Sequence, residues 1–141
     1  MNTKEQAQEL VNKVCEYYDI SLQELQSIKR SYHMKVMYNK RGDQVRLSEI
    51  RMALSYFIYK YCPIKLVEIA PLVGYADHST MSIYRKRIEY YIETEDIKFF
   101  PYYLKVIDIA SDLGIDMKLT RVQSYTDIIF KDHKGKIILA D

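Results

Sequence analysis

Apolar residues recur at helical spacing along most of the chain, and this pattern predicts a mainly α-helical protein. In the segment 3–18 they form one stripe, made by Leu10, Val11, Val14 and Tyr18. A long apolar helix is expected from Ser48 to about Tyr61, because Pro63 cannot continue it. Three further helices are expected over residues 65–73, 78–93 and 98–113. A glycine follows the first and the last of these three, as is common at helix ends.

Shorter signals mark the connections between these helices. Ser21 and Glu24 have the spacing of a capping box, which predicts a short helix starting after Ser21. The alternating segments KVMY and QVRL flank the turn sequence NKRGD at 39–43, so a small β-hairpin is expected there. Pro71 lies inside the helix expected at 65–73 and predicts a kink or an irregular start.

The C-terminal segment differs from the helical part in its pattern. Two apolar runs flank the sequence DHKG at 132–135, which indicates a β-hairpin. We therefore expect a helical domain over residues 1–110 and a C-terminal extension over residues 111–141, with its hairpin packed on that domain. The hairpin edge also offers a surface for a second copy of the chain or for a protein partner.

Composition narrows the class of protein. With 141 residues, 48% of them hydrophobic, the chain can bury a core and does not resemble a disordered protein. It has no apolar run of about 18 residues, as a membrane span requires, and its start lacks the apolar core of a signal peptide. Its two cysteines, Cys15 and Cys62, are too few for a disulfide framework. We expect a cytoplasmic protein without cofactor, in which Cys15 fills space on a helix.

Charge is concentrated in the middle of the chain. Residues 29–91 contain twelve basic and five acidic residues, net +7, whereas residues 1–28 carry net −3 and residues 92–141 carry net −2. A basic region between mildly acidic ends is typical of a surface that binds a polyanion, although a solvated charged surface gives the same tally.

The sequence GYADHSTM at 74–81 places Asp77, His78 and Ser79 next to one another and raises the possibility of catalysis. A catalytic triad needs side chains that converge from different segments, and consecutive residues point in different directions. His33, His78 and His133 are also far apart and have no metal-ligand companions in the sequence. We therefore expect a binding protein rather than an enzyme.

The helix expected at 78–93 has the features of a DNA-recognition helix. Asp77 is a suitable N-cap, and Met81, Tyr84, Ile88 and Ile92 form the stripe expected to be buried. The remaining residues are expected to face outward: His78, Ser79, Ser82, Arg85, Lys86 and Glu89. Short hydrogen-bonding groups thus precede cations, an order that suits base edges and then phosphates. With the helix at 65–73, this segment reads as a helix-turn-helix.

The run DHSTMSIYRKRIE at 77–89 resembles the signature of the DNA-binding domain of the bacterial replication initiator DnaA. Three further segments resemble that family in the same order: EYYDISLQELQSIKR (16–30), RLSEIRMAL (46–54) and KLVEIAPLVG (65–74). The resemblance spans roughly residues 8–108 and implies a helical bundle with a TrpR-like helix-turn-helix. It implies double-stranded DNA as the partner, with no membrane and no nucleotide cofactor.

The resemblance also implies roles for individual residues. Asp77, His78, Ser79 and Thr80 would lie at the major groove. Thr80 would alternatively contact a phosphate or a thymine methyl group. Lys29 and Arg30 would approach the DNA backbone or the minor groove. The residues expected to hold phosphate are Lys65, Arg85 and Lys86.

Departures from the family pattern shape the remaining hypotheses. Ala76 stands where the family usually has an arginine, and the basic loop at 31–45 is longer. We hypothesise that this loop acts as a wing whose Arg41 and Arg46 replace the missing contact. The chain has no counterpart of the family's ATPase module, so we expect a stand-alone reader of DNA in replication or transcription control. The alternatives are a protein–protein interaction module that reuses the fold and, given fourteen tyrosines, a binder of single-stranded nucleic acid or RNA.

Overall fold

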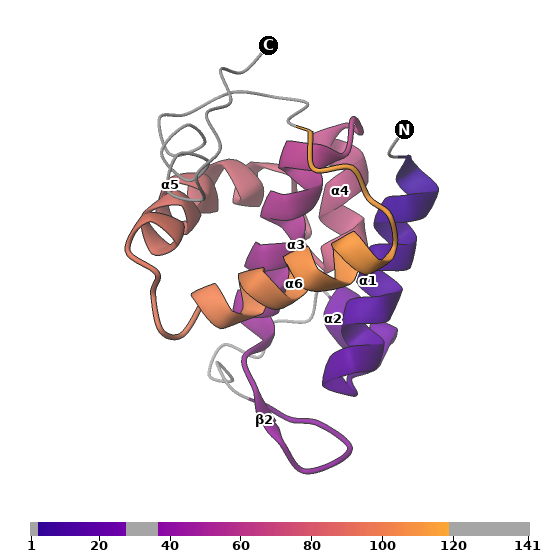
Figure 1. The fold of residues 1–141 in the computed structure, drawn as a ribbon, viewed down its shortest axis with the longest axis vertical. Helices are drawn as coiled ribbons and strands as arrows, with labels where there is room; N and C mark the ends of the chain where they lie inside the picture. The colour runs from indigo at the N-terminus through magenta and orange to yellow at the C-terminus, as the bar shows by residue number, and fades with distance from the viewer. Residues whose placement is uncertain (1–2, 28–36, 119–141) are drawn as a thin grey trace.

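Residues 3–27 and 37–118 are described by the structure, a computed structural model, and they form a mainly helical fold with one small antiparallel sheet (Figure 1). The prediction of a mainly α protein is therefore confirmed. In chain order the elements are α1 (Lys4–Tyr18), α2 (Leu22–Gln26), β1 (Met37–Tyr38), β2 (Gln44–Val45), α3 (Leu47–Tyr61), α4 (Leu66–Val73), α5 (Ser79–Glu93) and α6 (Phe100–Asp112).

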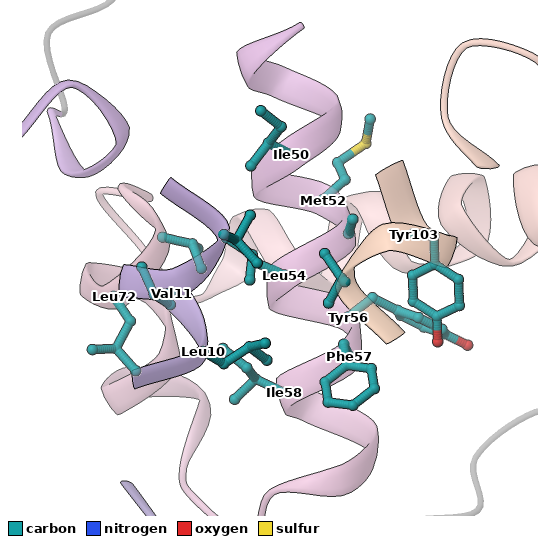
Figure 2. Packing of buried hydrophobic residues seen from close by; sticks show 14 of the residues in the cluster. Leu10, Val11, Ile50, Met52, Leu54, Tyr56, Phe57, Ile58, Leu72 and Tyr103 are labelled. Atoms are coloured by element: carbon teal, nitrogen blue, oxygen red, sulfur yellow. The ribbon is translucent and has the colours of Figure 1, made fainter. Parts of the chain in front are cut away.

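Helix α3 forms the centre of the fold, and α4, α5 and α6 all pack against it. Ten of its fifteen residues are buried, because apolar side chains leave it in nearly every direction. Figure 2 shows leucine and isoleucine side chains of α3 on the side of Leu10 and Val11 from α1. On another side Tyr56 lies near Tyr103 of α6, with ring centroids 6.1 Å apart (Figure 2).

The N-terminal helices follow their local sequence signals. In α1 the predicted stripe packs inward: its leucine and both valines are buried and its tyrosine is half-buried. The predicted capping box precedes α2, where Ser21 Oγ accepts from the Glu24 N–H at 2.9 Å and Glu24 Oε1 accepts from the Ser21 N–H at 3.3 Å. Cys15 lies in the core, as expected, and burial, followed by the charge of Glu24, raises the pKa of its thiol to about 11.

The small sheet is the hairpin predicted around residues 39–43. Its strands pair antiparallel, with Met37 opposite Val45. The buried side chain of Asn39 accepts from the N–H groups of Arg41 and Asp43 and donates to the carbonyl of Tyr18 at 2.7 Å. The hairpin is thereby tied to the end of α1, and it projects away from the bundle at the start of α3 (Figure 1). The second hairpin, expected at the C-terminus, lies outside the described residues.

Helix boundaries differ from the expected ones by one or two residues. Helix α3 starts at Leu47, one residue before Ser48, and α4 continues through Pro71 without interruption. Helix α6 was expected over residues 98–113 and spans Phe100–Asp112, so it crosses the domain boundary expected after residue 110. Ile115, which follows it, is buried in the same core. The described part of the extension thus begins as a continuation of the helical domain. No helix in residues 3–27 or 37–118 has both the length and the apolar character needed to cross a membrane.

Gly74 ends α4 where the backbone of α2 passes very close to it. Its φ of +90° is in the left-handed region, and a Cβ built there would lie 2.1 Å from the carbonyl oxygen of Leu25. Arg51 of α3 holds the same carbonyl, which accepts from its Nε at 2.9 Å, while Nη2 donates to the carbonyl of Ser27 at 3.1 Å. Burial lowers the pKa of the Arg51 guanidinium. The turn between α4 and α5 is therefore positioned through α2 and α3 together.

We predict that Gly74→Ala destabilises the protein much more than Gly114→Ala. Both glycines follow a helix and have positive φ, but a Cβ at Gly114 would meet nothing within 4 Å. Gly114→Ala should cost only the left-handed strain, about 1–2 kcal/mol. Gly74→Ala should add about 1–3 kcal/mol for the overlap with Leu25. Urea denaturation of both variants measures the difference, and equal losses would show that the close approach is unimportant.

Candidate nucleic-acid interface

Helices α4 and α5 are joined by the turn at 74–78, where the sequence predicts a helix-turn-helix, and both helices rest on α3. After Gly74, the N–H of Tyr75 donates back to the carbonyl of Ala70 at 2.9 Å, which closes the end of α4. The ring of Tyr75 then packs near that of Tyr84 in α5, with centroids 6.1 Å apart. The turn is thus fixed at both ends, and the entry of the chain into α5 is well defined.

The side chain of Asp77 holds the start of α5, where His78 is the N-cap residue and makes no side-chain capping hydrogen bond. Helix α5 begins at Ser79, one residue later than predicted, and Oδ1 of Asp77 accepts from the Ser79 N–H at 3.0 Å. This hydrogen bond, and to a lesser extent the nearby His78, lowers the pKa of the Asp77 carboxyl. His78 Nδ1 lies 3.3 Å from the same oxygen. His78 and Ser79 are exposed and Thr80 is half-buried, so the first turn of α5 presents polar groups to solvent.

The buried and exposed faces of α5 lie where the helical spacing predicts them. Met81, Ile88 and Ile92 are buried, and Tyr84 is half-buried. The opposite face carries a line of exposed residues at intervals of three or four, which we call the outward stripe: Ser79, Ile83, Lys86 and Tyr90. Ser82 and Arg87 flank this stripe and are also exposed.

Two residues expected to face outward are half-buried instead. Arg85 lines a cavity of about 170 Å³ between α3, α4 and α5, together with Ser55 and Tyr56. Glu89 is on the same flank, where its Oε2 accepts from the hydroxyl of Tyr56 at 3.2 Å. Both side chains point along the seam between α5 and α3, so neither belongs to the outward stripe.

Arg87 is an exposed cation of α5 that is not among the site residues predicted from the sequence. Its guanidinium lies 5.1 Å from the ring centroid of Tyr84. Together with Lys86 it gives the second half of α5 two accessible cations. Counting outward positions on a helical wheel around Met81 and Ile88 identifies Arg87 without any structure.

Lys65 lies at the start of α4, as the helix-turn-helix interpretation requires, and its side chain is exposed. Its backbone N–H donates to Oε1 of Glu68 at 3.2 Å, and this contact is the main reason that the pKa of Glu68 is lowered. Lys4 lies 3.5 Å from the other oxygen of Glu68. The one acidic residue in the first turn of α4 is therefore already paired.

Arg41 and Arg46 are not brought together with α5. Nε of Arg41 donates to Asp43 at 3.2 Å, and its Nη2 donates to the carbonyl of Tyr17 at 3.2 Å. Nε of Arg46 lies 2.8 Å from Oε2 of Glu49, and only 25% of the Arg46 side chain is exposed. Both arginines line an open cleft of about 1170 Å³ between α1, the hairpin and α6. These contacts leave the wing hypothesis without support in the described residues.

Lys29 and Arg30 lie outside the described residues. Ser27, the last described residue before them, is held by Arg51 next to the turn that precedes α5. The end of α2 therefore lies beside the turn between α4 and α5.

The tyrosines are mostly packing residues. In the described part of the chain, tyrosines 56, 61 and 103 are buried in the core, and a further group packs against it: tyrosines 18, 59, 75, 84, 91 and 102. Tyr17, Tyr38 and Tyr90 are exposed, but they belong to three different elements. This arrangement does not form an aromatic platform of the kind that stacks single-stranded bases.

Comparison of the chain with protein-family models, with curated proteins and with solved structures found no match.

Proposed function

We propose that this protein binds double-stranded DNA in a sequence-specific manner through α4, the turn at 74–78 and α5, as a replication-associated or transcriptional regulatory factor. The observation that carries the proposal is the composition of the exposed face of α5. Its first turn presents His78 and Ser79, and its later turns present Lys86 and Arg87. Hydrogen-bonding groups at the helix start suit base edges, and cations farther along suit phosphates.

The way α5 is anchored supports the same proposal. A recognition helix must keep its orientation while it enters the major groove. Helix α5 is held by its apolar stripe, by the hydrogen bond between Glu89 and Tyr56, and by the tight turn at Gly74. Its outward stripe contributes nothing to this anchoring. The face that would contact DNA is therefore free to do so without unfolding.

Charge and sequence resemblance add further support. The region that contains the helix-turn-helix is the basic part of the chain, with net charge +7 over residues 29–91. We extend the resemblance of residues 77–89 to the DnaA family into a proposal that the bundle has the fold of that DNA-binding domain. Within it, Lys65 at the start of α4 is assigned to the DNA backbone, because the first helix of such a motif crosses the phosphates.

The proposal is tested by fluorescence anisotropy of the whole chain with two labelled duplexes over a salt series. One duplex carries a DnaA-type box, and the other is a scrambled sequence of equal composition. Tighter binding to the box would establish a box reader. Equal, salt-sensitive binding would call for selection of a preferred site from random DNA. Absence of binding to every duplex at moderate salt would overturn the proposal and favour a protein partner.

Lys86→Gln and Arg87→Gln should each weaken binding to all duplexes alike. Each substitution removes one accessible cation from α5, and the slope of log affinity against log salt should become shallower by about 0.9. Lys13→Gln is the matched control, because Lys13 is an exposed cation on α1 that pairs with Glu16 at 3.8 Å, outside the helix-turn-helix. Unchanged slopes in both α5 variants would remove these residues from the interface.

His78→Ala should act differently from the cation variants. Because the imidazole is expected to bind a base edge, its removal should cost about 1–3 kcal/mol of binding free energy on the preferred site, with little change on scrambled DNA. The exposed position of His78 allows the substitution without disturbing the core, which circular dichroism can verify. Equal reductions in affinity for both duplexes would show that His78 does not read bases.

A further inference from the structure

Ile83 is a large apolar side chain in the middle of the outward stripe of α5, and it is 70% exposed. Single exposed apolar residues are common on protein surfaces and by themselves indicate nothing. The position of Ile83 is what distinguishes it. It lies one turn after Ser79 and one turn before Lys86, on the face opposite the buried Met81 and Ile88. It therefore contributes little to holding α5 on the bundle.

This inference rests on the proposed function and names part of its specificity. We propose that Ile83 reads a thymine by packing against its C5-methyl group in the major groove. That methyl is the one apolar group that the base pairs present there, and apolar side chains contact it in known recognition. An isoleucine on the groove-facing stripe has nothing to hydrogen-bond with, so a thymine methyl is the base feature that it can distinguish.

The position of the thymine relative to the other contacts follows from helix geometry. Ile83 is four residues beyond Ser79, which places it about 6 Å farther along the axis of α5. Successive base pairs are about 3.4 Å apart. The methyl that Ile83 contacts should therefore lie about two base-pair steps from the base read by the first turn of α5.

The surroundings of Ile83 favour DNA over a protein partner. Lys86 and Arg87 lie within one turn of it, and Ser79 and Ser82 lie on its other side. The centre of a protein–protein interface is usually depleted in charged residues. The next exposed large apolar residue on this stripe is Tyr90, about two turns away. One apolar side chain among hydroxyls and cations matches a single methyl in a groove lined by phosphates.

The test replaces each thymine of the preferred duplex, one at a time, with deoxyuridine. Deoxyuridine keeps the hydrogen-bonding groups of thymine and lacks only the methyl. We expect one thymine to be sensitive, about two base-pair steps from the base that His78 contacts. Its replacement should weaken binding of the wild-type chain about fourfold. This factor corresponds to about 0.8 kcal/mol for one methyl group removed from contact.

The variant Ile83→Ala should bind the thymine duplex more weakly by a similar factor and should no longer distinguish it from the deoxyuridine duplex. Ile83→Val should retain most of the discrimination. Tyr90→Ala, on the same stripe, is the matched control and should leave the deoxyuridine effect intact. All three residue changes are at exposed positions, so thermal unfolding should be nearly unchanged.

Two outcomes would overturn the inference, and they differ in what they say of the proposed function. Specific binding without any methyl-sensitive thymine, or discrimination that survives in Ile83→Ala, would refute the role of Ile83 while DNA binding stands. Absence of binding to every duplex would refute both. If the chain binds no duplex, a protein ligand whose binding is abolished by Ile83→Ala would identify the outward stripe as a protein interface.

Discussion

Everything else in the fold depends on the burial of α3. A helix with apolar side chains on nearly all sides is stable in water only when other elements cover each side. The partners α4, α5 and α6 meet this requirement directly, and α1 contributes side chains to the same core. Even Lys60 of α3 is buried, with its ammonium 5.2 Å from the ring of Tyr56 and 5.4 Å from that of Tyr61. The position of α5, and with it the candidate interface, follows from this covering of α3.

The parts of the fold that could be predicted from the sequence are those fixed by neighbours within a few residues. Ser21 and Glu24 cap α2 because both partners lie within one turn. The start of α3 shows the limit of such reasoning. The helix was expected to begin at Ser48, but α3 begins at Leu47, and the N–H of the preceding Arg46 donates to the hydroxyl of Tyr102 at 2.9 Å. That partner comes from a helix far along the chain, and no local pattern indicates it.

In the candidate site, too, some features follow from neighbours in the sequence and others depend on distant parts of the chain. The buried stripe of α5 follows from helical spacing alone. Asp77 was predicted as the N-cap, but the N-cap position is His78, and Asp77 accepts from the Ser79 N–H instead. Arg85 is four residues after Met81 and three before Ile88, so helical spacing itself places it next to the buried stripe. The position of Glu89 depends on Tyr56 of α3, whose hydroxyl donates to it and which periodicity does not specify. Arg46 is a second example. A basic residue in a basic region suggests a contact with DNA phosphate, but the guanidinium of Arg46 is already paired with the carboxylate of Glu49, with Nε 2.8 Å from Oε2. Charge counted along a sequence does not distinguish a cation that is free for a ligand from one that is already paired.

The separation of the two faces of α5 has a consequence for evolution and engineering. Its anchoring residues face α3, whereas Ser79, Ile83, Lys86 and Tyr90 make up a surface that the core does not need. Substitutions on such a surface usually change stability by less than about 0.5 kcal/mol. Mutations there can accumulate almost without selection against misfolding. The bundle is therefore a scaffold on which new ligand preferences can arise by replacing a few side chains while the architecture is inherited intact.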